Sequence, residues 1–396
     1  MIPDGVPRLR VRLAAVTAAI VITGGLLEGA SRIAFEWQDE IRTFPVISSV
    51  LQLGLDLDPY EMPSPRGGGH WILRPDFQAT LGAIAEWKKH AKRSLGGEIL
   101  EKILTESIQA PVSVIRINLD GFKGPEVDRS HAWPRILTLG DSTTFGIGNS
   151  DYPRVLEAAL TARGIPVEVI NGGVEGYSPI NLLFEMDRFK MLRPQIVTLY
   201  IGWNALFSRT PWPDAWENRI RFIWLVKSAY RSFQVRTRGA QEYTMSQLRR
   251  RPKPERTGND VKTLDAYVPP FMGKIEHIVE ELESAGAEVV LVTLPGLYTA
   301  SEFPSATALK MGHLPFYTEN PFVLAKLAER YNVALRSLAV RHGLGVIDLE
   351  EWGAEALRPR DAYFMDSVHL TPKGLNKIGT FIADQLAERV KELRAR

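Results

Sequence analysis

The sequence predicts a three-layer α/β/α domain built on a five-stranded parallel sheet and preceded by a segment that enters a membrane. Three observations support this fold class. From residue 134 onward, short apolar runs alternate with segments of helical spacing, which is typical of strands joined by right-handed crossovers. The apolar runs are uninterrupted, as expected for strands that are covered on both faces. Near the N-terminus a longer run, 13–27, carries no charge.

The composition excludes several classes of protein. Of the 396 residues, 45% are hydrophobic and 24% are charged, so the chain is expected to fold around a sizeable core. The formal net charge of +2 gives no reason to expect a nucleic-acid partner. The absence of cysteine excludes disulfides and thiolate metal sites. Because no histidine motif typical of zinc and no P-loop is present either, we expect neither a metal nor a cofactor.

Residues 1–34 are expected to be a signal anchor or a signal peptide. Three arginines precede the uncharged run; they are Arg8, Arg10 and Arg12. The run is shorter than the ~20 residues that span a bilayer and fits the hydrophobic region of a secretory signal, but the best cleavage site, at 29–31, is poor. We therefore favour an uncleaved anchor over a cleaved signal or a buried core helix. With either of the first two, the arginines keep the N-terminus cytoplasmic and send the rest of the chain outside.

Residues 35–133 are expected to form an extension of irregular structure. Proline and glycine are frequent in it, and the segments 70–75 and 116–124 read as extended stretches that end in turns. The spacing over 83–107 predicts one or two helices. The extension could form a wall or lid of an active site, or serve as a stalk and packing layer, which we favour.

In the main domain, 134–396, strands and helices are expected to alternate regularly. The expected strands are 136–139, 167–170, 196–201, 288–294 and 345–348. The expected helices are 152–163, 180–192, 271–284, 322–342 and a last one that continues toward residue 394. Pro153 fits the first turn of the first helix, Gly164 and Gly286 fit helix ends, and Thr371 with Pro372 fits the start of the last helix.

An insertion, 206–265, interrupts the alternation. Arginines and lysines in it interleave with aromatic residues, for example Arg219, Arg221 and Lys227 with Phe222 and Tyr230. Such a segment could lie on an anionic membrane surface or clamp an anionic glycan. The third interpretation, which we favour, is a solvated helix that covers the pocket and continues into a linker.

Two loops at the same edge of the predicted sheet carry the residues of nucleophilic hydrolysis. Ser142 follows the first strand, and Asp366 and His369 follow the fifth. Ligands of open α/β sheets bind beyond the carboxyl ends of the strands, where these loops lie. Such hydrolysis needs a hydroxyl, an imidazole that takes its proton and a carboxylate that orients the imidazole. We therefore expect the three side chains to meet.

Two further loops at that edge have the residues of an oxyanion hole. The loop 171–178 contains three glycines, and Asn204 follows the third strand within Gly202-Trp203-Asn204. Glycine lets a backbone approach a substrate closely, and a side-chain amide donates a hydrogen bond. Tight turns and a strand-end cap are the structural alternatives.

The order of these four motifs resembles the SGNH/GDSL hydrolase superfamily. They are Gly-Asp-Ser, Asn-x-Gly-x-x-Gly, Gly-x-Asn and Asp-x-x-His, and they run from residue 140 to 369. The resemblance implies a five-stranded flavodoxin-like parallel sheet, the SGNH hydrolase fold. It implies Ser142 as nucleophile, His369 as general base and Asp366 as the orienting acid. The oxyanion donors would be the Ser142 and Gly176 backbone amides and the Asn204 side chain.

Three other features bear on the resemblance. The apolar N-terminus and the segment 118–124 are similar to those of membrane-anchored bacterial members. Thr143 stands where the family's name has leucine, and Ala205 replaces the aspartate that often follows the asparagine of the third motif. The second departure removes an expected support of Asn204.

The favoured function is a serine esterase or deacylase that acts outside the cytoplasm on an ester-bearing small molecule, glycan or lipid. An O-acyltransferase that modifies an envelope or secreted polysaccharide, and a non-catalytic glycan-binding module, are the alternatives. We expect Trp203 and Tyr177 to bind substrate, and Tyr298 and Phe364 to border the pocket.

Overall fold

The computed structural model describes four long stretches of the chain, 6–37, 57–90, 113–212 and 252–395, together with residues 215, 219–223, 225–227 and 230. Two expectations from the sequence therefore lie outside the described residues. One is any helix between 91 and 107, and the other is most of the arginine-rich insertion and its linker.

The centre of the molecule is a five-stranded parallel sheet. Its strands, in spatial order, are β6 (Glu168–Gly173), β5 (Arg135–Gly140), β7 (Ile196–Tyr200), β8 (Glu288–Val292) and β9 (Gly345–Ile347). All residues of β5 and β7 are buried, as the uninterrupted apolar runs predicted. The chain order, with the second strand at one edge, is the flavodoxin-like order. The predicted fold class is confirmed.

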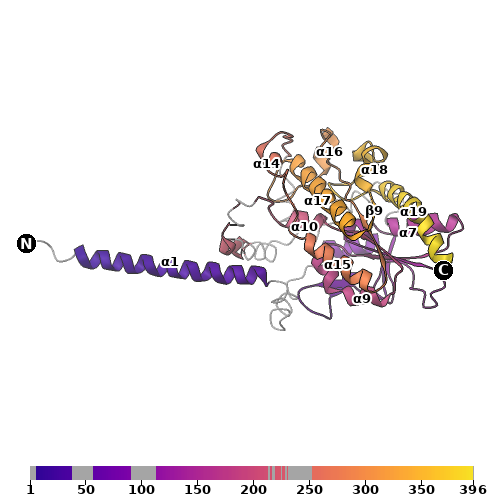
Figure 1. Ribbon diagram of the computed structural model, residues 1–396, viewed down its shortest axis with the longest axis horizontal. Helices are drawn as coiled ribbons and strands as arrows, with labels where there is room; N and C mark the ends of the chain where they lie inside the picture. Colours follow the sequence, from indigo (N-terminus) through magenta and orange to yellow (C-terminus); the bar gives the residue numbers. More distant parts are fainter. Residues whose placement is uncertain are drawn as a thin grey trace, which may run out of the picture.

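Helices cover both faces of the sheet (Figure 1). Helices α7 (Tyr152–Ala162) and α19 (Pro372–Ala395) pack together on one face. The other face carries α8 (Pro179–Phe184), α9 (Met186–Met191), α15 (Met272–Ser284) and α17 (Pro321–His342). A Cβ at Gly379 would lie 2.6 Å from the Val155 Cβ, so glycine is what lets α19 approach α7 this closely.

The predicted helix starts and ends are confirmed at several positions. Asp151 caps α7 by accepting a hydrogen bond from the Arg154 amide at 2.9 Å. Thr371 accepts one from the Gly374 amide at 3.2 Å at the start of α19. Gly343 ends α17 in the left-handed conformation, with φ of 68°. These local contacts satisfy backbone groups that a helix end would otherwise leave unpaired.

The structure differs from the prediction in two helices. The helix expected at 180–192 is interrupted at Glu185, whose carboxylate accepts a hydrogen bond from Ser64 at 2.6 Å. This partner lies 121 residues away in the chain, so helical spacing could not reveal it. An additional helix, α18 (Leu349–Ala356), follows β9 and is capped by Asp348, which accepts a bond from the Glu351 amide.

The extension ahead of the sheet forms two antiparallel pairs. They are β1 (Glu61–Pro63) with β2 (Trp71–Leu73) and β3 (Phe77–Thr80) with β4 (Val114–Ile117); α4 (Leu81–His90) follows β3. Lys123 forms an isolated bridge with Asn171 and so joins the extension to the edge of the sheet. Its buried ammonium donates to the Phe145 carbonyl at 2.6 Å and lies 3.2 Å from the Asp151 carboxylate. The described part of the extension is thus packed onto the sheet domain.

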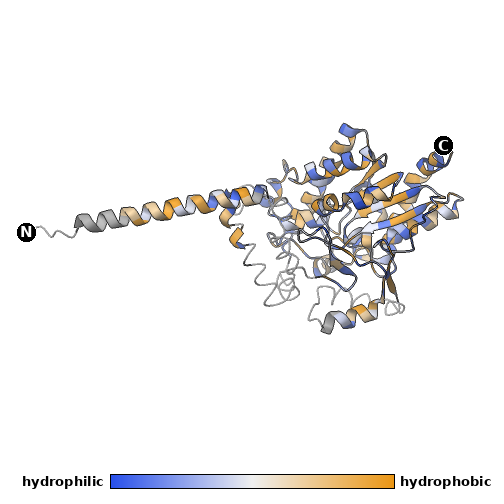
Figure 2. Cartoon of the chain, turned by 90° about the horizontal axis from the view of Figure 1, so that it is seen from below, coloured by the Kyte–Doolittle hydropathy of each residue, from blue (hydrophilic) through white to orange (hydrophobic). Residues whose placement is uncertain are grey.

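Helix α1 (Val6–Glu36) projects from the body of the molecule (Figures 1 and 2). Within it, Ala14–Ala34 is long and apolar enough to cross a bilayer. Figure 2 shows hydrophobic residues along the coloured middle part of this helix, and Ile20 is 67% exposed. This exposure contradicts the alternative of a buried core helix.

Three short helices lie in the connections near the carboxyl edge of the sheet. They are α10 (Trp203–Ser208), α14 (Asn259–Lys262) and α16 (Ala306–Met311).

Candidate active site

Ser142 lies directly beyond the carboxyl end of β5, as the first residue of the short helix α6 (Ser142–Phe145). Asp141 caps this helix, with its carboxylate accepting from the Thr143 amide at 2.9 Å and the Thr143 hydroxyl at 2.7 Å. A Cβ at Gly140 would lie 2.1 Å from the Thr144 Oγ1. Glycine there lets α6 fold tightly against the strand end, so the Gly-Asp-Ser motif has a local structural reason. Ser142 itself stays partly exposed between buried neighbours.

The structure brings together the three side chains that the sequence placed at this edge. The Ser142 Oγ lies 2.7 Å from the His369 Nε2, and the His369 Nδ1 lies 2.7 Å from the Asp366 Oδ2. A carboxylate only accepts hydrogen bonds, so the Nδ1 donates and the Nε2 of the neutral ring accepts the Ser142 hydroxyl. Ser142 and His369 are 227 residues apart in the chain. This arrangement allows the hydroxyl proton to pass to the imidazole.

The segment between Phe364 and the start of α19 holds Asp366 and His369 rigidly. The Asp366 Oδ1 accepts hydrogen bonds from the amides of Val368 and His369, both at 2.8 Å. The Ser367 hydroxyl donates to the His313 carbonyl, and the Ser367 carbonyl accepts from the Leu297 amide. Asp366 is only 2% exposed. The orientation of the carboxylate is therefore fixed by backbone contacts before any ligand arrives.

Burial and charge have opposite effects on the pKa values of Asp366 and His369. Burial alone raises the pKa of Asp366, but attraction to His369 and His313 and the hydrogen bonds from His369 outweigh it and hold that pKa well below its usual range. Burial lowers the pKa of His369, but the charge and hydrogen bond of Asp366 raise it to about 9. Asp366 therefore favours the imidazolium that forms when the ring takes a proton.

The expected oxyanion donors lie on the loops after β6 and β7. Gly176 has φ of 76°, and a Cβ there would lie 3.0 Å from the Trp71 ring, so only glycine fits without strain. The Asn204 Nδ2 donates to the Tyr177 carbonyl at 2.9 Å. This bond orients the Asn204 amide, which was expected to lack support because Ala205 replaces an aspartate. Its second N–H hydrogen remains for another acceptor.

A cleft of about 580 Å³ lies beside Gly176 and Asn204. Its walls come from separate parts of the chain: Trp71 from β2, and Tyr267 and Phe271 from the connection between α14 and α15. Two cationic residues, Arg209 and Lys274, also line the cleft. The cleft thus combines aromatic rings, amide groups and positive charge.

The extension contributes to this cleft as a wall as well as a packing layer. The Trp71 Nε1 donates to the Glu175 carbonyl at 3.1 Å, and the Tyr60 hydroxyl donates to the Glu175 carboxylate at 2.6 Å. Both contacts hold the loop that carries Gly176. No motif in the sequence indicated Trp71, because its role depends on where the extension packs.

The prediction that Trp203 and Tyr177 bind substrate through their rings needs correction. Trp203 is 3% exposed and Tyr177 is fully buried. The Tyr177 hydroxyl donates to the Trp71 carbonyl, while its own carbonyl accepts from Asn204. Aromatic residues next to glycines in a motif are as suited to packing as to ligand contact. In this structure both rings support the loops from within.

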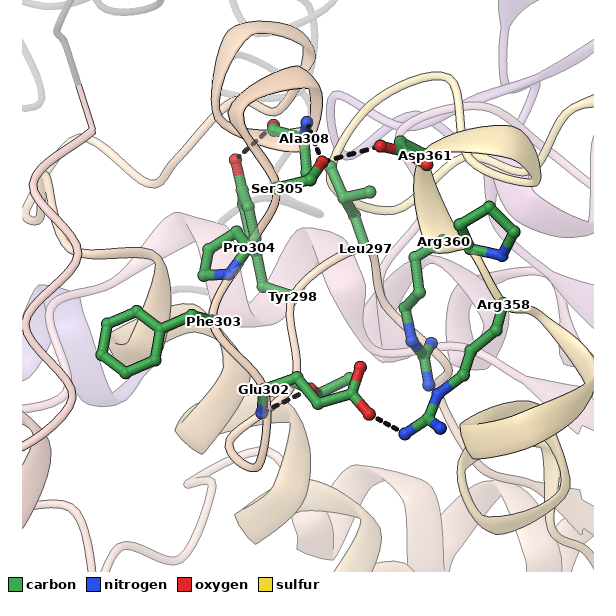
Figure 3. A pocket seen from close by; sticks show the side chains of 12 residues that line it. Leu297, Tyr298, Glu302, Phe303, Pro304, Ser305, Ala308, Arg358, Arg360 and Asp361 are labelled. Atoms are coloured by element: carbon green, nitrogen blue, oxygen red, sulfur yellow. Dashed lines mark hydrogen bonds and ion pairs between the residues drawn. The ribbon is translucent and has the colours of Figure 1, made fainter.

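The other two expected pocket residues also lie elsewhere. Phe364 is fully buried. Tyr298 lines a second cavity of about 290 Å³, shown in Figure 3, and donates from its hydroxyl to the Ala308 carbonyl at 3.1 Å. Arg358 pairs with Glu302 across this cavity. Since the Leu297 amide binds the Ser367 carbonyl, the cavity lies behind the segment that holds Asp366.

His313 is a neighbour of the site that sequence reasoning missed. Its Nδ1 lies 3.8 Å from the Asp366 Oδ2, and its ring packs against Phe207 with centroids 5.1 Å apart. Burial lowers the pKa of His313 despite the attraction of Asp366. Its sequence neighbours, Met311 and Gly312, carry no motif. Among the described residues, no cluster of three potential metal ligands occurs.

The fold and the arrangement at its carboxyl edge are those of a hydrolase that acts on ester bonds. The chain belongs to the GDSL-like Lipase/Acylhydrolase family, whose model matches residues 138–376, more than half of the chain. The resemblance stated from the four motifs is thereby confirmed. The match includes Ser142, Asp366 and His369.

Solved structures of similar arrangement each cover about two thirds of the chain. A lipase/acylhydrolase from Enterococcus faecalis is 18% identical, covers 65% of this chain and 96% of its own, and has a TM-score of 0.40. The acetyl xylan esterase AlAXEase is 16% identical, covers 64% and 99%, and scores 0.39. A variant of the acetyl xylan esterase Axe2 from Geobacillus stearothermophilus is 14% identical, covers 65% and 94%, and scores 0.41. No curated protein sequence gives a significant match.

Proposed function

We propose that this chain is a membrane-anchored serine esterase or deacylase whose catalytic residues are Ser142, His369 and Asp366. The observation that carries the proposal is the continuous hydrogen-bonded path from the Ser142 hydroxyl through His369 to Asp366, with 2.7 Å at each step. Residues 1–34 would be the anchor, 35–133 the extension and 134–396 the catalytic domain with its insertion at 206–265.

In the proposed mechanism, the Ser142 Oγ attacks the ester carbonyl carbon while the His369 Nε2 takes the hydroxyl proton. The carbonyl π electrons move onto oxygen, and the resulting oxyanion accepts hydrogen bonds from the backbone amides of Ser142 and Gly176 and from the Asn204 side chain. Collapse breaks the bond to the alcohol, which leaves with the proton from His369. Water, deprotonated by His369, then cleaves the acyl-serine ester and restores the free hydroxyl.

The cleft beside Gly176 and Asn204 is the proposed binding site for one half of the ester. Rings at Trp71, Tyr267 and Phe271 suit stacking against a sugar or contact with an acyl chain. Amide and hydroxyl groups in the same cleft suit the hydroxyls of a glycan. An O-acylated glycan combines both requirements and is the proposed substrate class.

The proposed location is outside the cytoplasm, with α1 in the membrane. Three arginines lie on the N-terminal side of Ala14–Ala34, and by the positive-inside rule they keep that end cytoplasmic. The catalytic domain follows on the opposite side. Secretion after cleavage would place the same domain outside without the anchor.

The test uses the full chain in detergent or nanodiscs. Ser142→Ala should abolish labelling by a fluorophosphonate probe and lower kcat for p-nitrophenyl acetate by up to ~10⁶-fold, because no other group supplies the attacking oxygen. Ser337→Ala is the matched control, since Ser337 is exposed on α17 and donates only to the Val333 carbonyl. Labelling that persists in Ser142→Ala would overturn the assignment. Product analysis with an added glycan separates hydrolysis from acyl transfer.

A further inference from the structure

The insertion contacts helix α1 near the end of its apolar run. The Glu28 carboxylate accepts hydrogen bonds from the backbone amides of Arg221 at 3.1 Å and Phe222 at 2.9 Å. Arg32 pairs with Glu28 at 2.8 Å and donates to the Arg219 carbonyl at 3.0 Å. These partners are almost 200 residues apart in the chain. The contact ties the beginning of the insertion to one level along α1.

That level can be placed relative to a bilayer. The uncharged run, 13–27, spans about 22 Å as a helix, at ~1.5 Å per residue, whereas the hydrocarbon core is ~30 Å thick. With Arg12 at the cytoplasmic boundary, Arg32 lies about 30 Å further along the helix, at the outer boundary of the hydrocarbon, and Glu28 lies about one helical turn inside it. The backbone amides that bind Glu28 must lie at the same depth. A carboxylate at such a boundary needs hydrogen-bond donors, and the insertion supplies them.

The described part of the insertion has the side chains of an interfacial segment. Leu225 is 40% exposed, Val226 is 50% exposed and Tyr230 is 59% exposed. Arg219 and Lys227 are exposed among them. Exposed apolar and aromatic side chains interspersed with cations suit the boundary between acyl chains and anionic headgroups.

We infer that the described residues 219–223, 225–227 and 230 lie in the headgroup region of the bilayer that α1 crosses and bind anionic phospholipid there. The inference rests on the proposed anchoring by α1 and adds a second, reversible membrane contact. It also decides between the interpretations of the insertion: none of the described residues from 219 to 230 lines the cleft beside Asn204. That part of the insertion faces lipid and does not cover the pocket.

The chain has no cysteine, so single cysteines can report local environment without a background. Val226→Cys would carry an environment-sensitive fluorophore in the full chain, reconstituted in nanodiscs of phosphatidylcholine with or without phosphatidylglycerol. Ile20→Cys on the exposed surface of α1 is the positive control. Val340→Cys, 84% exposed on α17, is the matched control in water. Ester hydrolysis by each labelled variant confirms that it is folded.

The expected result is blue-shifted emission and strong quenching by spin-labelled lipid at positions 20 and 226, and neither at 340. Phosphatidylglycerol should increase the effect at 226, and the paired change Arg219→Gln and Arg221→Gln should reduce it while leaving position 20 unchanged. If the fluorophore at position 226 gives the emission and quenching of position 340 while position 20 is in lipid, the inference is overturned and the proposed anchor is unaffected. A blue shift without quenching by lipid would indicate packing against protein and overturn it as well. If position 20 is itself in water, the proposed anchor fails and the inference with it.

Discussion

Replacement of Asp366 by asparagine tests the charge relationships of the site directly. The asparagine side chain has nearly the same shape, so the amides of Val368 and His369 keep an acceptor, but the negative charge is lost. In the native protein the His369 Nδ1 lies 2.7 Å from the carboxylate. In the variant it meets a neutral amide, which does not select the same tautomer of the ring. In serine hydrolases with this arrangement such a change lowers kcat by ~10⁴-fold, and we expect a loss of that order.

The same variant should move the pH dependence in a defined direction. Only the neutral imidazole accepts a proton from Ser142, so kcat/KM rises as pH increases through the pKa of His369. In the native protein that pKa is raised to about 9, chiefly by Asp366 against the opposing effect of burial. Without Asp366, burial has the largest effect on the pKa of His369 and lowers it. The remaining charged or titratable neighbours are Asp141, Glu175 and His313. The acidic limb should therefore move to lower pH, toward or below the ordinary value of about 6.5.

The assay is the pH profile of kcat/KM for p-nitrophenyl acetate, measured with native protein and Asp366→Asn. Asp361→Asn is the matched control, because Asp361 lies in the same connection, binds the Ser305 hydroxyl and borders the second cavity. It should leave both rate and limb unchanged. An acidic limb that stays in place in Asp366→Asn, or moves to higher pH, would refute the reasoning.

Three further predictions concern the oxyanion donor, the packing at the strand end and the anchor. Asn204→Ala should lower kcat by ~10²–10³-fold with little effect on KM, as steady-state kinetics would show, whereas a raised KM with unchanged kcat would argue for a binding role. Gly140→Ala should lower the free energy of unfolding by ~1–3 kcal/mol, because the added Cβ meets the Thr144 Oγ1. Gly273→Ala, where nothing lies within 4 Å, should raise it by ~0.5–1 kcal/mol, and thermal melts compare the two. Removal of residues 1–36 should release the chain from membranes that are sedimented after a high-salt wash, because salt screens the second, reversible contact of the insertion. Continued sedimentation in folded, active form after that wash would contradict anchoring by α1.

The regular elements of the sheet domain could be predicted because their signals are local. Apolar runs, capping residues such as Asp151 and Thr371, and the left-handed Gly343 act within one or two turns of themselves. The interruption at Glu185 could not be predicted, because it accompanies a contact with Ser64 in the extension. Helical spacing reports which face is apolar and carries no information about such a partner.

The residues of the candidate site also form two groups, those that short motifs predicted and those that the motifs missed or misplaced. Ser142, Asp366, His369, Gly176 and Asn204 each stand in a short motif whose residue types are demanded by chemistry or by the turn. The residues that surround them were missed or misplaced. Tyr177 and Trp203 stand in the motifs but point inward, while Trp71 and His313 reach the site from segments that carry no motif.

The sequence by itself determined the order of strands and helices, the ends of the helices and the types of residue at the carboxyl edge of the sheet. Tertiary structure alone decided the hydrogen bond between Ser142 and His369, the wall that Trp71 adds to the cleft, and the contact between Glu28 and the insertion. The physical reason is distance along the chain. Backbone preference, capping and apolar spacing act between near neighbours, whereas these three contacts exist only after the sheet, the extension and α1 have packed into place.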